Sequence, residues 1–228
     1  MIDNRFLLKI VQALKRYTAA IISVVVILAI ILSYFHYKSN EKIRAANNAS
    51  IHYEYFISAL KAGKINELSE EKEIVLRLDP KGIYGGFVLL WQAKRAVEEN
   101  KITAAAETLR QLEESSSISY LRDLARLRLA RVQVQGKNYP AAFQSLDRME
   151  GTTFQPLALE LRGDICLEPK AKTKANTVQN CLNSIDEDQA RKFYALAGDM
   201  LAQIGVKENR ILEMKSNELG VKLSKEVK

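Results

Sequence analysis

Residues that interrupt helices are scarce in this chain of 228 residues, which has ten glycines and four prolines. Ala, Leu, Glu, Lys and Arg are plentiful, so a mostly helical protein is expected. The two cysteines are too few for a disulfide scaffold. There are two histidines, His36 and His52, and neither lies beside a cysteine or carboxylate cluster at metal-ligand spacing. No metal site and no cofactor is therefore predicted.

Asp, Glu, Lys and Arg are absent from Tyr17–Tyr37, a run of 21 residues. As a helix the run spans about 30 Å, the thickness of a bilayer's hydrocarbon core, which predicts a transmembrane helix. A cleavable signal peptide is the main alternative. Its apolar stretch is normally about 7–15 residues long, and residues 33–38 offer no small-x-small cleavage site. A buried core helix of this length usually keeps a polar face, which this run lacks.

Basic residues flank the run unevenly, with four before it and three after it: Arg5, Lys9, Lys15, Arg16, Lys38, Lys42 and Arg44. This slight bias favours an amino terminus in the cytoplasm. Residues 1–16 are a basic amphipathic tail, expected to lie on the anionic leaflet. The tail carries +3 of the net charge of +7, and the remainder is too mild to predict nucleic-acid binding. Residues 38–49 are either a linker or a continuation of the membrane helix.

From about residue 50 the chain repeats with a period of 37 residues. The equivalent positions are Phe56, Ala93 and Ala130; Leu60, Val97 and Val134; Ile65, Ile102 and Tyr139; Leu68, Ala105 and Ala142; and Val75, Leu112 and Met149. Spacings of three and four place these residues on one side of each helix, with a break at Gly63, Asn100 or Gly136. Each unit is therefore predicted to be a helical hairpin.

A fourth hairpin is expected with altered spacing. Gly163 takes the small position 33 residues after Ala130, and Ala175 follows 12 residues later. The acidic residues 186–188 open another helix, which is expected to cap the stack. The prediction is thus an all-α protein: a transmembrane helix, then a domain over residues 50–206 of about four hairpins and a capping helix. Residues 207–228 form a charged extension.

The same hairpin geometry predicts whether the two cysteines can form a disulfide. If Gly163 and Ala175 face each other, Cys166 and Cys181 lie about 13 Å apart along the helix axis, beyond the Cα reach of about 7 Å for a disulfide. Buried free thiols are therefore predicted rather than a bridge.

The repeat resembles the tetratricopeptide repeat, which has small residues at these offsets. The whole arrangement resembles the YfgM-type ancillary subunits of the SecYEG translocon. The best local matches are residues 83–86, 127–133 and 161–164. The resemblance implies a non-enzymatic protein of the bacterial inner membrane with a periplasmic domain, acting beside the Sec translocon. Its implied partners are a periplasmic chaperone of the prolyl-isomerase type and unfolded exported proteins.

Stacked hairpins form a concave surface that suits an extended segment or a partner helix. We predict partner binding at Trp91, Arg95, Arg128 and Arg131, although Trp91 could instead fill the core. Arg122 and Arg126 lie opposite an apolar stripe and are expected on a solvated face. No catalytic constellation is found, so an enzyme is disfavoured. The alternative function is an envelope-assembly scaffold that binds outer-membrane or surface-machine components.

Overall fold

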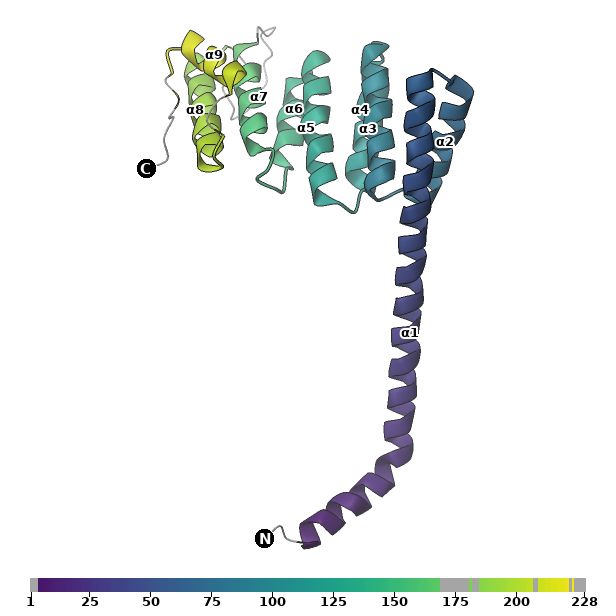
Figure 1. Cartoon of the computed structure of the whole chain (residues 1–228). Coiled ribbons are helices and arrows are strands. Elements are labelled where there is room, and N and C mark those ends of the chain that lie inside the picture. The colour runs from purple at the N-terminus through teal and green to yellow at the C-terminus, as the bar shows by residue number, and fades with distance from the viewer. Residues whose placement is uncertain (1–3, 169–180, 182–184, 207–208, 222, 224–228) are drawn as a thin grey trace.

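A computed structural model describes residues 4–168, 181, 185–206, 209–221 and 223 (Figure 1). In this part of the chain every regular element is a helix, which confirms the predicted all-α fold. The helices are α1 (Asn4–Ala62), α2 (Ile65–Leu78), α3 (Ile83–Glu98), α4 (Ile102–Ser115), α5 (Ser119–Gln135), α6 (Tyr139–Asp147), α7 (Gln155–Leu167), α8 (Glu187–Gln203) and α9 (Arg210–Glu218).

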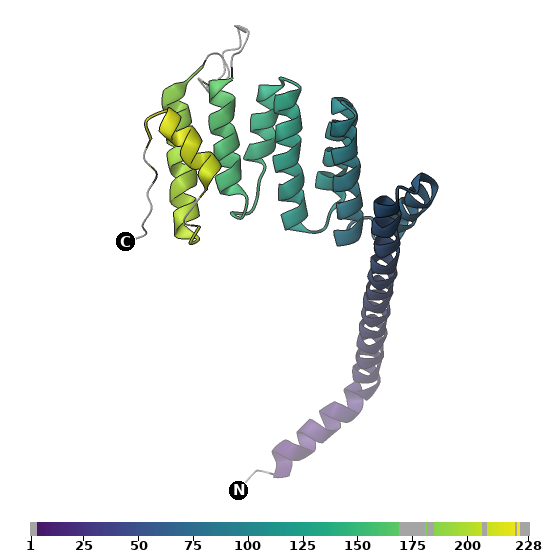
Figure 2. The ribbon, with the colours of Figure 1, turned by 45° about the horizontal axis from the view of Figure 1, so that its top comes forward.

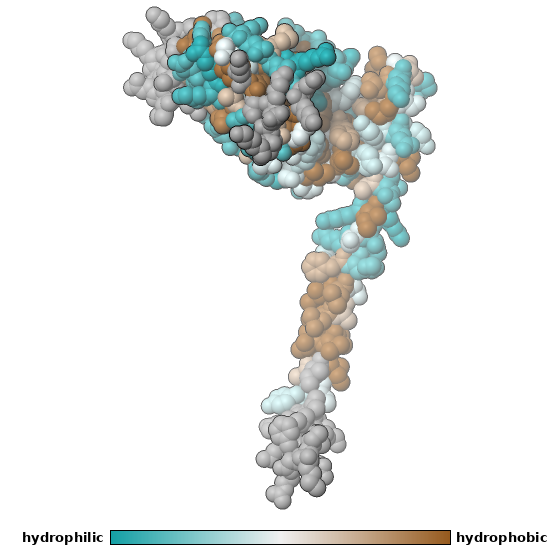
Figure 3. All heavy atoms as spheres, turned by 60° about the vertical axis from the view of Figure 1, so that its left-hand side comes forward, coloured by the Kyte–Doolittle hydropathy of each residue, from teal (hydrophilic) through white to brown (hydrophobic). Residues whose placement is uncertain are grey.

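Helix α1 is continuous over 59 residues, from the amino-terminal tail into the first hairpin. Residues 38–49 therefore continue the helix of the apolar run without a break. Within the apolar run, side chains such as Ile22 and Leu32 are 62% and 67% exposed, so the run is not a core helix of this chain. Figure 3 shows these apolar side chains as a band on α1. The stretch is long and apolar enough to span a membrane.

The helices form a row of hairpins that extends sideways from the end of α1 (Figure 1). The pairs are α1 with α2, α3 with α4, α5 with α6, and α7 with α8. The period of 37 residues is visible in the backbone, because Gly63, Asn100 and Lys137 all adopt positive φ, at 67°, 58° and 57°. After each one the chain closes the same turn and starts the second helix. The sequence period therefore predicted the hairpin turns correctly.

The predicted repeat positions are buried or partly buried, except Ile65, which is 77% exposed. Phe56, Ala93 and Ala130 are at most 3% exposed, and the alanines of the second helices, Ala105 and Ala142, are fully buried. One apolar cluster joins α3, α4 and α5, and another joins α5, α6, α7 and α8. A smaller cluster joins the first hairpin to α3.

The fourth hairpin differs from the prediction. Its second helix was expected around Ala175, which lies outside the described residues, and the helix that packs on α7 is α8. A Cβ atom on Gly163 would lie 2.3 Å from the ring of Tyr194, so this glycine makes room for an aromatic ring. Helix α9 then covers the pair, since Leu212 is buried against Tyr194. The helix predicted to open at residues 186–188 is present as α8, where it packs on α7, and α9 lies within residues 207–228, which were predicted as a charged extension.

The prediction of free thiols was wrong, because Cys166 and Cys181 form a disulfide with Cα atoms 4.5 Å apart. The prediction assumed that both cysteines lie on facing helices of one hairpin. Instead α7 ends at Leu167, and Cys181 lies outside the regular helices that the structure describes. The chain has returned to the end of α7 by Asp186, whose backbone N–H donates to the carbonyl of Cys166 at 3.0 Å.

Candidate partner-binding groove

Two hollows lie between successive hairpins, on either side of α3. The first hollow, between the first hairpin and α3, has a volume of about 570 Å³. The second hollow, between α3 and α5, has a volume of about 310 Å³. Trp91 lines the first hollow and Arg128 lines the second, and the two residues are equivalent positions 37 residues apart. The two hollows therefore belong to one face of the row, which we call the groove.

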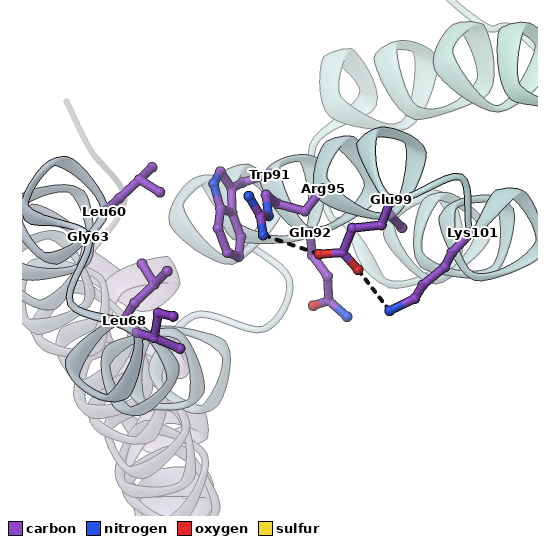
Figure 4. Close-up of a pocket in the computed structure, with 10 residues that line it drawn as sticks. Leu60, Gly63, Leu68, Trp91, Gln92, Arg95, Glu99 and Lys101 are labelled. Carbon is purple, nitrogen blue, oxygen red and sulfur yellow. Dashed lines mark hydrogen bonds and ion pairs between the residues drawn. The ribbon is translucent and has the colours of Figure 1, made fainter.

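Trp91 is half-buried in the wall of the first hollow (Figure 4). Its ring packs edge to face on Phe56, with centroids 5.1 Å apart. Trp91 therefore joins the small core of the first hairpin and also presents part of its surface to the hollow. Trp91 was predicted either to bind a partner or to fill the core, and its position is compatible with both roles.

The rim of the first hollow carries a chain of exposed ion pairs (Figure 4). Arg95 donates to Glu99 at 3.1 Å, and Lys101 donates to the same carboxylate at 2.8 Å. The hydrogen bond and charge of Lys101, with those of Arg95, lower the pKa of Glu99. Pairs this exposed are weak, but an acidic partner would still have to displace Glu99 from Arg95. Arg95 is therefore a weaker candidate for binding an acidic partner than its charge suggests.

The second hollow has an apolar floor and a basic rim. The floor is lined by Leu90, Ala93, Val97, Leu109 and Val132. At the rim, Arg128 and Arg131 are exposed, and among the described residues no ion pair or hydrogen bond engages either guanidinium. Lys94 lies beside them and is 3.6 Å from Glu98. Two free guanidinium groups above apolar surface suit a segment that carries both apolar and acidic side chains.

The structure thus divides the four predicted residues between two neighbouring hollows. Trp91 and Arg95 line the first, whereas Arg128 and Arg131 line the second. Helix α3 is the wall that the hollows share.

The prediction for Arg126 was wrong, because this side chain is buried in a charge network and not solvated. Its residue is 8% exposed, and its guanidinium donates to Glu113, Asp123 and Glu150 at 3.0 to 3.1 Å. Arg122 is partly buried and donates to Glu150 at 2.7 Å. The network ties the second hairpin to the third. A signal was present in the sequence, since Glu113 and Glu150 are one 37-residue period apart.

Asp123 fixes the chain that leaves α6. Its carboxylate accepts hydrogen bonds from the backbone N–H groups of Glu150 and Gly151, at 2.9 and 2.7 Å. The acids of this cluster therefore have structural partners. In the described part of the chain, no group of three or more His, Cys, Asp or Glu side chains is placed to hold a metal ion. His52 of α1 forms a hydrogen bond with Glu71 of α2, with 2.7 Å between Nδ1 and the carboxylate oxygen.

Comparison with known proteins places the chain in a family. A family model described as a tetratricopeptide repeat-like domain matches residues 13–221. A protein of Escherichia coli named ancillary SecYEG translocon subunit is 30% identical over 171 residues, which cover 73% of this chain and 82% of that protein. Proteins of the same name from Buchnera aphidicola and Haemophilus influenzae are 24% and 29% identical, over 65% and 51% of this chain and 76% and 57% of their own lengths. No solved structure matches the chain.

The family model covers most of the chain, and the Escherichia coli relative extends over most of both sequences. Both agree with the hairpins, their common turn and the long apolar helix described above. The chain therefore belongs to the family of ancillary SecYEG translocon subunits, proteins built on a tetratricopeptide repeat-like domain.

Proposed function

We propose that this protein is a non-enzymatic scaffold of the bacterial inner membrane that acts beside the Sec translocon. Its periplasmic domain would receive exported proteins and hand them to a periplasmic chaperone of the prolyl-isomerase type. The observation that carries the proposal is the second hollow, an open apolar and basic surface on a row of hairpins that a membrane helix holds in place. Because its relatives are named as SecYEG translocon subunits, we favour a place beside the Sec translocon over a place in another membrane or beside another membrane complex.

The continuous helix α1 supports a role near the membrane. Residues 38–49 extend the apolar run by about 18 Å of helix, at about 1.5 Å per residue, before the first hairpin begins. Because no loop interrupts α1, the groove is held at a fixed height and the row lies sideways to α1 (Figure 1). A tether of this kind raises the local concentration of the groove, so weak contacts with passing chains suffice.

The disulfide supports a periplasmic domain. Disulfides persist in oxidising compartments and are rare where thiols are kept reduced, and Cys166 and Cys181 are paired and buried here. The slight excess of basic residues before the membrane run favours the same orientation.

Protease treatment of intact spheroplasts tests the orientation. We expect added protease to degrade the domain and leave a protected fragment that contains the amino-terminal tail and the membrane helix. A domain that stays intact until the cells are lysed would contradict a periplasmic location.

Copurification in mild detergent tests the setting. We expect the full-length chain to enrich Sec components together with a periplasmic prolyl isomerase. Enrichment of outer-membrane assembly or surface-machine proteins without any Sec component would reject this proposal in favour of an envelope-assembly scaffold.

A further inference from the structure

The carboxy-terminal helix α9 lies across α7 and α8 (Figure 2). Its two buried residues, Leu212 and Ser216, face inward, and Leu212 packs with Tyr194 and Ala197 of α8. Helix α9 therefore fills a surface that the fourth hairpin would otherwise expose.

Lys215 makes charged contacts between α9 and α7. Lys215 Nζ donates to Glu160 at 2.6 Å and to Asp164 at 2.8 Å. Asp164 also accepts a hydrogen bond from the hydroxyl of Tyr194, at 2.8 Å. Burial disfavours the charge on Lys215, but its hydrogen bonds to the two carboxylates raise its pKa overall. The fourth hairpin thus presents a pair of acids that require a cation.

The same face of the row carries the opposite charge on the preceding hairpins. Asp164 follows Arg131 by 33 residues, and Arg131 follows Lys94 by 37, so the three occupy equivalent positions on α7, α5 and α3. Lys94 and Arg131 line the second hollow. Helix α9 therefore lies on the groove face, over its acidic end, and leaves the basic end open.

Several features make α9 a weakly held occupant. It has nine residues, and isolated helices shorter than about 12–15 residues are marginal in water. Its outer side exposes Ile211 and Met214, which are 63% and 65% accessible. The buried hydroxyl of Ser216 has no hydrogen-bond partner among the described residues, so the fit against the hairpin is incomplete.

We propose that α9 is an exchangeable internal ligand of the groove, and that the surface it covers binds basic amphipathic segments of a partner protein. The matching segment carries an apolar residue followed three positions later by Lys or Arg, as Leu212 and Lys215 do in α9. Such a segment displaces α9 and pairs its cation with Glu160 and Asp164. This inference goes beyond the translocon setting, because it concerns the chemistry of one surface.

The test uses the full-length chain in detergent and a fluorescent peptide of residues 209–221. In the wild type, the tethered α9 competes at an effective concentration of about 1 mM, so the peptide binds weakly. Lys215→Glu places a carboxylate against Glu160 and Asp164 and expels α9. We expect this variant to bind the peptide at least tenfold more tightly than the wild type, and its α9 amides to exchange hydrogen faster.

Arg210→Glu is the matched control, because it makes the same charge change on an exposed residue of α9 for which no ion pair is seen among the described residues. This variant should bind the peptide as weakly as the wild type. A second control is the same peptide with Glu in place of Lys215, which should not bind the Lys215→Glu chain.

Three results would overturn the proposal. The first is a Lys215→Glu chain that gains no peptide binding or keeps α9 protected from exchange. The second is equal binding of the two peptides. The third is a wild-type dimer that exchanges α9 between copies, since the surface would then be filled by a second chain. None of these results depends on whether Sec components copurify.

Discussion

At the scale of single residues, whether a charged side chain is buried depends on which residues of the neighbouring hairpin pair with it. Arg126 and Arg128 are two positions apart on α5, yet Arg126 is buried among three carboxylates and Arg128 is exposed at the groove. Helical angle alone predicted Arg126 on a solvated face. The difference comes from Glu113, which the preceding hairpin brings within 3.0 Å of Arg126.

Replacing Arg126 by Ala is expected to destabilise the domain strongly. The change leaves the buried Asp123 without its cation, and breaking a buried pair costs about 3–5 kcal/mol. We expect a loss near the lower end of this range, because Glu113 keeps its pair with Arg148. Urea unfolding followed by circular dichroism measures the loss. Arg122→Ala is the control, because its pair with the half-exposed Glu150 is worth at most about 1 kcal/mol. Equal losses for the two variants would contradict the network.

Glu113 makes part of this stability depend on pH. Burial opposes its ionisation, but hydrogen bonds from Arg148 and Arg126 outweigh that effect and lower its pKa. Because the folded-state pKa lies below the unfolded one, the contribution is complete above about pH 4.5 and is lost as pH falls through the folded-state pKa. Unfolding at several pH values between about 7 and 3 should show a smaller acid loss in Glu113→Gln. Identical pH profiles would show that Glu113 plays no such role.

At the scale of elements, the period of 37 residues predicted three hairpins because their turns and buried positions recur together. Ile65, Ile102 and Tyr139 begin the three second helices, as the spacing required. The fourth hairpin could not be predicted in the same way. A small residue such as Gly163 specifies a close approach but not its partner, which is the ring of Tyr194 rather than a second small side chain. The disulfide was not predicted for a related reason: the expected spacing of the cysteines assumed that Gly163 faces Ala175, whereas it faces Tyr194.

The disulfide is expected to stabilise the fourth hairpin. It joins residues 15 positions apart, and closing a loop of that length contributes about 3 kcal/mol in the chain-entropy description. Reductant should therefore lower the thermal midpoint of the wild type. The double variant C166S/C181S should melt at the lower temperature and be insensitive to reductant. A fully reduced wild type, verified by mass, with an unchanged midpoint would contradict this expectation.

The groove on α3 and α5 gives a further prediction at this scale. The double variant R128E/R131E reverses the basic rim of the second hollow, so we expect at least a tenfold loss of binding to acidic, apolar partner segments. The control R77E/R110E makes the same charge change at exposed positions on α2 and α4. Pulldown of the periplasmic chaperone measures both variants. Equal binding by the two would remove the second hollow from the partner site.

At the scale of the whole molecule, one helix, α1, contains both the apolar run and the first helix of the hairpin row. Helix α1 runs without a break from the apolar run into the first hairpin, so the groove is joined to the apolar run by continuous helix. Along that groove the charge changes from the basic rim at α3 and α5 to the acids of α7, where Lys215 of α9 lies. The sequence predicted the basic residues, but the acidic end became apparent only when α9 was seen to cover it.

We propose that the second hollow contacts exported proteins or their chaperone. Cross-linking in living cells tests it most directly, with a photoreactive residue in place of Gln135, an exposed residue that lines the hollow. The control carries the same residue in place of Gln144, which is exposed on α6 and does not line the hollow. We expect adducts with a periplasmic chaperone or exported chains from position 135 and not from 144. Equal adducts from both positions, or adducts only with cytoplasmic proteins, would contradict it.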